Sequence, residues 1–258
     1  MSSKVCIVTS CAIGYWNTYG RQGLVTMLQH FPEEVDIHLV SEHELPLHEI
    51  DRPAVTKREG RFQFHSLDNN HEAAVFYMRH ANNKRVHGTE KHFYDFRLDA
   101  FRFSKKVFAI QLVSRMVQGR LIWLDADTVT LKPIPMDFLL RMPPEGSALA
   151  YLDRGNKYHS ECGFVGYNLE HPATREFITQ FAGLYATDEV FKLKEWHDSW
   201  VFDWIRNKLR VPSHKIPHTN NGHPFVCSEL GHYMDHLKGA RKRTGVSPEH
   251  PRFGPRRK

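Results

Sequence analysis

The sequence predicts a single α/β domain, with a mixed and mostly parallel sheet flanked by helices. Three observations favour this class. The chain opens with a strand, a loop, a helix and a second strand; strand and helix patterns continue to alternate after this opening; and neither an internal repeat nor a linker divides the chain. A length of 258 residues, of which 41% are hydrophobic, is enough to bury one large core.

The opening unit combines two strands and one helix. Residues 4–10 (KVCIVTS) predict a strand, residues 21–30 a helix after the loop CAIGYWNTYG, and residues 35–40 (VDIHLV) a second strand. Such an opening is typical of nucleotide-binding sheets, although the G-x-G-x-x-G pattern of a dinucleotide site is missing. Residues 41–95 are polar, rich in histidine and weakly periodic, so we expect loops and short helices there.

The second half of the chain continues the alternation. Helical spacing predicts a helix over 104–117, with Ser104 as its N-cap and Gly119 ending it. The apolar run in LIWLDADTVT, at 121–130, is typical of a strand buried on both faces. Two further strands are predicted over 148–153 and 163–169, and two further helices over 171–186 and 199–209.

Composition narrows the class of protein. No apolar run approaches the roughly 18 residues of a membrane-spanning helix. The start MSSKVCIVTS lacks the features of a signal peptide. We therefore expect a protein without a membrane span that acts in the cytoplasm. The four cysteines match no zinc pattern, and most of the 18 histidines lack ligand spacing, which favours reduced, partly buried thiols over a zinc or disulfide scaffold.

Positive charge gathers at the C-terminus. From Lys238 to Lys258 there are eight lysines and arginines and one acid, Glu249, which gives this stretch a charge of +7. Because the whole chain has a net charge of +6, residues 1–237 sum to −1. Such a segment can hold a phosphate-bearing ligand, a nucleic acid or an anionic membrane surface. We expect residues 1–246 to form the domain and residues 247–258 to form a basic, flexible tail.

Two carboxylates, Asp125 and Asp127, end the buried strand of LIWLDADTVT. Residues two apart share a face while a strand stays extended, and like charges at this spacing repel unless positive charge lies between them. Carboxylate oxygens suit Mn²⁺ or Mg²⁺, and these ions usually also bind ligand phosphates. The pattern favours a cation site that holds a diphosphate; the alternative is an ordinary turn containing aspartate.

LIWLDADTVTLKPIP resembles the D-x-D strand of glycosyltransferases with the GT-A fold. Far downstream, HLKGARK resembles the H-x-x-G-x-x-K pattern that glycogenin-like and lipopolysaccharide-galactosyltransferase-like retaining enzymes carry near their C-termini. The resemblance implies a Rossmann-like GT-A domain that uses a nucleotide sugar, with a UDP-sugar favoured, and a divalent Mn²⁺ or Mg²⁺ ion. It also implies retention of the anomeric configuration, whereas the residues themselves leave an inverting reaction open.

The same resemblance assigns residues to the ion and the donor. Asp125, Asp127 and His236 would ligate the metal, with Asp125 also near the donor. Lys242 would grip the diphosphate. The family's Pro-Trp is replaced by Arg-Thr just after Lys242, so Lys238 stays an alternative for that role.

Two intermediate segments resemble parts of the family that lie near the sugar. ECGFVGYNL resembles a segment that enters a strand beneath the sugar, so Glu161 would contact sugar hydroxyls; the alternative is binding of solvent. EWHDSWVFD resembles an acidic segment that faces the anomeric carbon, so Asp198 would lie near the reacting centre with His197 beside it. Capping of a helix by Asp198 or Ser199 is the other interpretation.

The remaining donor contacts are expected from two more segments. In FRLDAFRFSKK, relatives use a basic residue and a carboxylate to hold diphosphate and sugar, which implies Arg102 and Asp99; a solvated helix face is the alternative. In and before the first loop, Thr9 and Tyr15 are candidate contacts to base or ribose, against simple aromatic packing.

Motifs spread over most of the chain, among them GYWNTYG, ECGFVGYNLEHP and KEWHDS, also resemble a group of phage-type proteins. This group overlaps the TET-associated glycosyltransferases, which put sugars on 5-hydroxymethylated pyrimidines in phage DNA. The resemblance implies a DNA acceptor in a host cytoplasm. The basic C-terminal run could attract phosphates, and Trp16, Tyr19, Trp196 and Trp200 could stack on an exposed base.

Two alternatives to DNA modification stay open. The same chemistry could serve a saccharide, lipopolysaccharide or protein acceptor. A basic binding protein that lacks catalytic activity is the alternative from a different class. The sequence predicts no oligomeric state.

Overall fold

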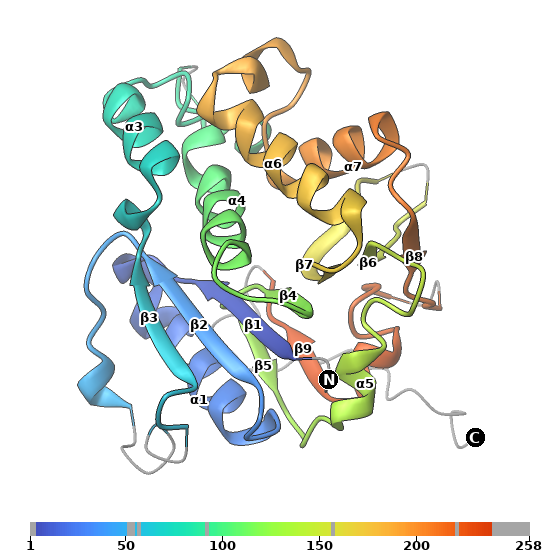
Figure 1. Ribbon diagram of the computed structural model, residues 1–258. Helices are drawn as coiled ribbons and strands as arrows, with labels where there is room; N and C mark the ends of the chain where they lie inside the picture. The colour runs from blue at the N-terminus through green and yellow to red at the C-terminus, as the bar shows by residue number, and fades with distance from the viewer. Residues whose placement is uncertain are drawn as a thin grey trace.

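The computed structural model describes residues 4–50, 55, 58–90, 93–155, 158–219 and 222–238. The expected tail at 247–258 and the domain limit at 246 lie outside these residues. A seven-stranded sheet runs through the molecule in the order β3-β2-β1-β4-β7-β6-β8 (Figure 1). Its strands are β1 (Val5–Ser10), β2 (Asp36–Ser41), β3 (Phe62–Ser66), β4 (Arg120–Leu124), β6 (Leu149–Leu152), β7 (Glu161–Asn168) and β8 (Ser213–Lys215).

The sheet is mixed and mostly parallel, as the sequence predicts. Every neighbouring pair runs parallel except the two that involve β7, which is antiparallel to β4 and β6. A separate two-stranded ribbon pairs β5 (Thr128–Thr130) with β9 (Met234–His236). The fold therefore confirms the predicted class and adds a small ribbon that the sequence pattern did not indicate.

Helices cover both faces of the sheet. They are α1 (Arg21–His30), α3 (His71–His80), α4 (Ala100–Ser114), α5 (Met136–Leu140), α6 (Pro172–Ala186) and α7 (Asp198–Lys208). Short 3-10 turns lie at Ile13–Tyr15, Leu47–Glu49, Leu67–Asn69, Phe96–Leu98, Glu189–Lys192 and Glu229–His232, and a π turn lies at Trp16–Gly20. In the described part of the chain, no helix is both long and apolar enough to cross a bilayer.

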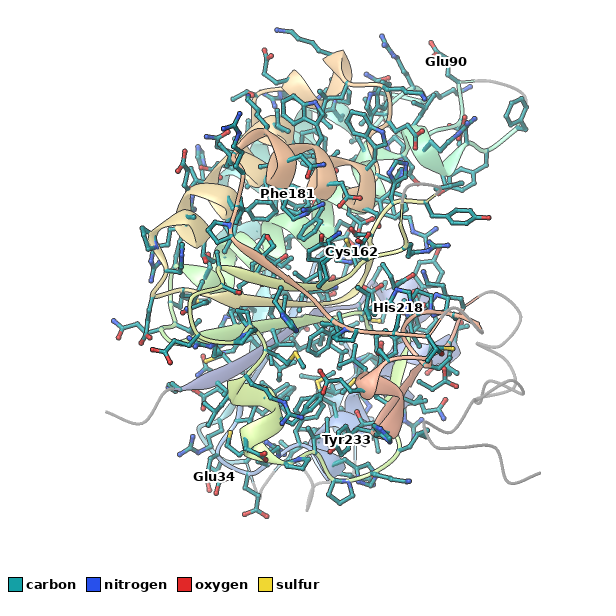
Figure 2. The ribbon with its side chains drawn as sticks, turned by 90° about the vertical axis from the view of Figure 1, so that its right-hand side faces the viewer. Glu34, Glu90, Cys162, Phe181, His218 and Tyr233 are labelled. Atoms are coloured by element: carbon teal, nitrogen blue, oxygen red, sulfur yellow. The ribbon has the colours of Figure 1, made fainter. Side chains whose placement is uncertain are left out.

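Strand alternation divides the core into two layers. Along β1, Cys6 and Val8 pack with α3, α4, α6 and α7 on one face, whereas Val5 and Ile7 pack with α1 and α5 on the other. Figure 2 shows the two layers edge-on, with Phe181 in the first layer and Tyr233 in the second. All four cysteines are buried and unpaired, as expected.

Three local predictions need correction. Helix α4 starts at Ala100 and is capped by Asp99, whose carboxylate accepts from the Arg102 backbone N–H at 2.9 Å. Ser104 is therefore not the N-cap: it is buried inside the helix, where its hydroxyl donates to the Phe101 carbonyl at 3.1 Å. The segment 41–95 holds a sheet strand and a ten-residue helix, β3 and α3, besides loops.

The third correction concerns the strand predicted over 121–130. Strand β4 ends at Leu124, a turn follows, and the chain leaves the sheet to form β5. The Thr128 backbone N–H donates to the Asp125 carbonyl at 3.0 Å and closes this turn. Asp125 and Asp127 thus sit in the turn after the buried strand and not within an extended strand.

Candidate active site

A cavity of about 760 Å³ opens at one edge of the sheet. It is bounded by Ser10 at the end of β1, by the turn that follows β4, and by Glu161 at the start of β7. Ligands of open α/β sheets bind beyond the carboxyl ends of their parallel strands, which is where this cavity lies. The edge that carries Asp125 and Asp127 is therefore also the edge that is hollowed.

The β5–β9 ribbon brings the distant His236 to this edge. Thr128 of β5 is registered with His236 of β9, and the Leu237 backbone N–H donates to the Asp127 carbonyl at 2.9 Å. The histidine is 1% exposed, so ribbon and core together fix its ring. The pairing places the imidazole of His236 beside two carboxylates from the turn after β4. His236 is hydrogen-bonded to Asp127, which lies 109 positions earlier in the chain.

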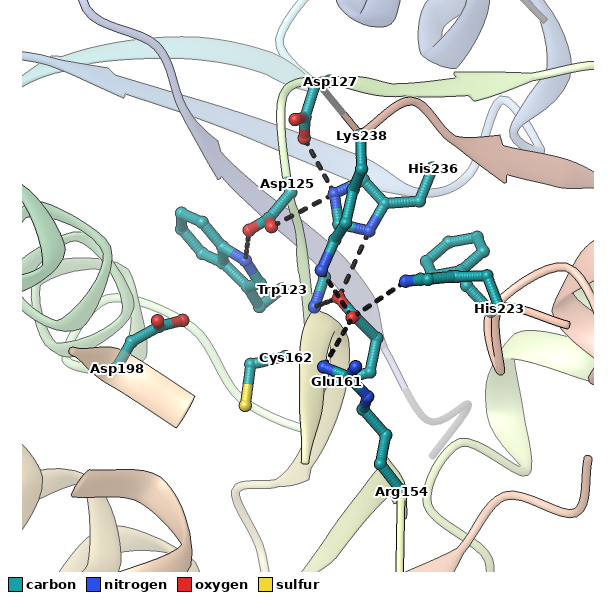
Figure 3. A network of polar contacts seen from close by, with 12 residues as sticks. Trp123, Asp125, Asp127, Arg154, Glu161, Cys162, Asp198, His223, His236 and Lys238 are labelled. Atoms are coloured by element: carbon teal, nitrogen blue, oxygen red, sulfur yellow. Dashed lines mark hydrogen bonds and ion pairs between the residues drawn. The ribbon is translucent and has the colours of Figure 1, made fainter. Parts of the chain in front are cut away.

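The three side chains converge on one point (Figure 3). Nε2 of His236 lies 3.0 Å from Oδ1 of Asp127 and 3.5 Å from Oδ2 of Asp125. One ligand atom from each residue falls within 4.8 Å of the other two. Two carboxylate oxygens and one imidazole nitrogen at this spacing fit a divalent ion of the Mn²⁺ or Mg²⁺ class, with positions left for a diphosphate.

Gly163 on β7 allows His236 to approach. A Cβ atom at this glycine would lie 2.4 Å from Nδ1 and 2.5 Å from Cε1 of His236. Real Cβ contacts are not that short, so any side chain here would displace the buried ring. The small residue in ECGF, which lies within strand β7, is thus required by the close approach of a metal-ligand candidate.

Glu161 holds His236 from the opposite side. Its Oε1 lies 3.3 Å from Nδ1 of His236, and its Oε2 accepts from His223 at 3.1 Å and from Lys238 at 2.5 Å (Figure 3). Burial alone would raise the pKa of Glu161, but these neighbours hold it well below its usual value. A carboxylate behind an imidazole orients the ring and increases its basicity, as in many metal sites.

The metal-free protein should lose thermal stability as pH rises from about 7 to above 9. Burial would lower the pKa of His236, but Asp127 and Glu161 raise it to about 9. A group with a raised pKa in the folded chain stabilises the fold below its unfolded pKa of about 6.5, and this contribution is lost as pH rises through the folded value.

Scanning fluorimetry with a chelator checks this expectation. Between pH 7 and 9.5 the melting temperature of the wild type should fall more than that of His236→Gln, which has no such proton to lose. Parallel pH curves for the two proteins would contradict a raised pKa at His236.

A buried lysine links the metal-ligand candidates to the predicted reacting centre. Nζ of Lys106 on α4 lies 3.0 Å from Oδ1 of Asp125 and 2.8 Å from Oδ2 of Asp198, and it also donates to the Cys162 carbonyl at 2.5 Å. Burial would lower the pKa of Lys106, but the two carboxylates raise it well above its usual value. The indole of Trp123 donates to Oδ1 of Asp125 at 2.6 Å. Oδ2 of Asp125 is thereby left facing His236.

The structure places most of the predicted site residues around one cavity. Those that line it are Tyr15, Arg102, Asp125, Asp127, Glu161, His197, Asp198, His236 and Lys238. The guanidinium of Arg102 lies 5.5 Å from the centroid of the Tyr15 ring. Lys242 lies outside the described residues, so its predicted contact with the diphosphate stays a prediction.

Asp198 is not the cap of α7. His197 occupies the N-cap position, while the Asp198 carboxylate lies against Lys106. Burial would raise the pKa of Asp198, but Lys106 and His197 hold it below its usual value. His197 is buried beside it and contacts Glu195, with Nε2 lying 3.0 Å from Oε2.

Two predicted donor contacts do not line the cavity. Asp99 is buried and occupied by capping α4 and by accepting from the Tyr94 hydroxyl at 2.8 Å. Thr9 is buried within β1, and its neighbour Ser10 lines the cavity in its place. An aspartate that caps a helix and one that binds a ligand look the same in a sequence, which explains the first error.

The expected stacking residues are also corrected in part. Trp16 and Trp196 are 1% and 3% exposed and belong to the core, so they cannot stack on a base. Trp200 is partly buried and packs against the core, whereas Tyr19 lines the cavity and stacks on Tyr15 at 5.3 Å between centroids. Aromatic content alone did not separate packing from exposure.

Several residues of the site were not expected from the sequence. These are Lys106, Trp123, Arg154 and His223. Lys106 could have been found, because it lies on the same helical stripe as Phe103, Ile110 and Val113, and a lysine on an apolar stripe indicates a buried partner. The others carry no comparable pattern, since each reaches the site through the tertiary fold.

Known glycosyltransferase structures resemble the fold of this chain. No known family model and no curated protein matches the chain. The glycosyltransferase GlyE of Streptococcus pneumoniae TIGR4 superposes with a TM-score of 0.51 at 11% identity, over 83% of this chain and 45% of GlyE. An active-site mutant of LgtC gives 0.50 at 12% identity, over 82% of this chain and 72% of LgtC. The chain spans less than half the length of GlyE, and its single α/β domain has the fold of these glycosyltransferase structures.

Proposed function

We propose that the protein transfers a sugar from a nucleotide-sugar donor to an acceptor hydroxyl, with Mn²⁺ or Mg²⁺ bound by Asp125, Asp127 and His236. The observation that carries this proposal is the convergence of two carboxylates and an imidazole on one point of a cavity at the sheet edge. The cavity has a volume in the range of small-molecule sites, and the fold is that of known glycosyltransferase structures.

The donor diphosphate would lie between the ion and the basic residues of the cavity. When bound, the divalent ion supplies positive charge that stabilises the departing nucleoside diphosphate. Lys238, which contacts Glu161 and is 41% exposed at its side chain, is the described lysine best placed to turn toward that diphosphate. Arg102 and Tyr15 line another part of the cavity, where we place the nucleoside, with UDP favoured by the sequence resemblance.

Asp198 would act through its charge. An ion-paired carboxylate with a lowered pKa is a weak proton acceptor, so this environment favours electrostatic stabilisation of an oxocarbenium-like sugar over general-base catalysis. Lys106 fixes the carboxylate and thereby keeps its position constant relative to Asp125. This arrangement supports a retaining reaction over an inverting one that would need Asp198 as a base.

The acceptor would meet an aromatic rim at the mouth of the cavity. Phe96 and Tyr158 line the cavity and are 53% and 64% exposed, and Arg97 and Arg154 lie beside them. Exposed rings beside arginines suit a base that is flipped out of DNA and its phosphates. Together with the resemblance, this favours 5-hydroxymethylpyrimidine in phage DNA, modified in the host cytoplasm. The same rings could stack on a saccharide, which is the second candidate.

Two assays test the proposal in sequence. Hydrolysis of UDP-sugars should require Mn²⁺ or Mg²⁺ and should stop with a chelator. Mass spectrometry should then show a hexose-sized or related sugar added to a hydroxymethylated duplex and not to unmodified DNA. Addition to glycans alone would favour the second candidate. No turnover of any nucleotide sugar with either metal would favour a binding protein without catalytic activity.

A further inference from the structure

A second group of ligand-type side chains lies in the same cavity, apart from the Asp125 site. It consists of His159, Glu195 and His197. Oε2 of Glu195 lies 3.0 Å from Nε2 of His197 and 3.6 Å from Nε2 of His159. The side chains of Glu195 and His197 are 15% and 8% exposed, and that of His159 is 40% exposed.

We propose that His159, Glu195 and His197 bind a transition-metal ion of the Zn²⁺ class, separate from the ion of the Asp125 site. Two histidines and one glutamate form one of the ligand sets that zinc sites with an open fourth position use. Zinc bonds of about 2.0–2.1 Å at tetrahedral angles place ligand atoms roughly 3.3–3.4 Å apart. The distances from Oε2 of Glu195 to the two imidazole nitrogens, 3.0 Å and 3.6 Å, lie on either side of that value.

The backbone fixes two of the three ligands before any ion arrives. Trp196 is buried, its backbone N–H donates to the Arg97 carbonyl at 2.7 Å, and its indole donates to the Leu193 carbonyl at 3.1 Å. Glu195 and His197 flank Trp196 in the chain, and their side chains meet in the cavity, with Oε2 lying 3.0 Å from Nε2. The third ligand, His159, comes from the segment before β7, so an ion would join that segment to the start of α7.

The surroundings suit a site that is open on one side. The ring of His197 lies 5.5 Å and 5.9 Å from the rings of Phe96 and Phe103, which form an apolar wall. All three ligand residues line the cavity, so a fourth position would face it and could take an oxygen atom of a ligand there. A nitrogen-rich set favours Zn²⁺, whereas the set with two aspartates favours Mn²⁺ or Mg²⁺.

A third group of ligand-type side chains, Cys6, Asp36 and His38, does not line the cavity. Asp36 is occupied by ion pairs with Lys4 at 2.6 Å and Arg61 at 3.3 Å. Burial raises the pKa of Cys6 to about 12, so releasing its proton to an ion would cost more than for an ordinary thiol. We therefore propose a zinc site only at His159, Glu195 and His197.

Zinc titration of the full chain tests the proposal, with Asp127→Asn as the background so that the first site is disabled. This protein should bind one Zn²⁺ per chain by calorimetry, and Co²⁺ in its place should give the visible bands of a four-coordinate ion. Adding His159→Gln should weaken Zn²⁺ binding at least about tenfold. His71→Gln, which changes an exposed histidine on α3, is the matched control and should leave binding unchanged.

Two results would overturn the proposal. One is the absence of Zn²⁺ binding in the Asp127→Asn protein; the other is binding that neither His159→Gln nor Glu195→Gln weakens. The second variant covers the case in which one substitution impairs folding. Because the readout is metal binding, it stands apart from sugar transfer, and either proposal can fail without the other.

Discussion

Replacing Lys106 with methionine should destabilise the protein by about 3–5 kcal/mol, the usual cost of removing one partner from a buried ion pair. Its ammonium group lies within 3.0 Å of both Asp125 and Asp198, and its side chain is only 11% exposed. Methionine keeps most of the volume and removes the charge, which leaves two carboxylates without their shared cation. Urea denaturation in the presence of a chelator measures the loss.

The neighbouring Lys105 provides a matched control. Its ammonium lies 2.5 Å from Glu42, with side chains that are 23% and 22% exposed. Lys105→Met should cost no more than about 1 kcal/mol. Combining Lys106→Met with Asp198→Asn should recover part of the stability lost by the first change, because one unpaired charge is removed. Equal losses for the two lysine variants would show that Lys106 does not bridge the carboxylates.

Replacing Asp127 with asparagine should lower metal-dependent turnover of a nucleotide sugar by about 100-fold or more, since changes even to residues that merely orient metal ligands cost 10–100-fold. The substitution keeps the shape of the side chain and removes the charge that faces His236 at 3.0 Å. Asp137→Asn is the control, because this aspartate is 79% exposed on α5 and belongs to no part of the cavity.

The measurement is donor hydrolysis with saturating Mn²⁺, together with a circular dichroism check that both variants fold. Turnover by Asp127→Asn at the wild-type rate would remove this aspartate from the site. Turnover that falls equally in Asp137→Asn would point to a general effect on the fold and not to the metal.

The main elements of the fold could be predicted because their patterns are local. Helix α1 has the bounds expected from its spacing, and the strands β1, β2, β6 and β7 lie where apolar runs indicated them. The edge strand β3 was missed because its residues are only partly buried and show no clear alternation. Short, half-exposed strands are determined by their neighbours more than by their own sequence.

Part of the candidate site could be predicted, because sequence motifs pointed to residues that the fold then brings together. Asp125, Asp127 and His236 were expected together from a resemblance, and the β5–β9 ribbon accounts for their meeting. Three-residue strands so far apart in the chain leave no periodic signal, so this pairing could not be derived from the residues. The capping role of Asp99 was missed because a capping aspartate and a ligand-binding one look the same in a sequence, whereas the place of Lys106 on the apolar stripe of α4 does indicate its buried partners.

Pulsed electron paramagnetic resonance of bound Mn²⁺ tests the central claim most directly, because it detects nitrogen atoms coordinated to the ion. The experiment is best done in a His159→Gln background, which disables the other histidine-bearing group. We expect nitrogen coupling from one imidazole, and we expect it to disappear when His236→Gln is added. Bound Mn²⁺ without nitrogen coupling, or coupling that persists in the His236→Gln protein, would contradict it.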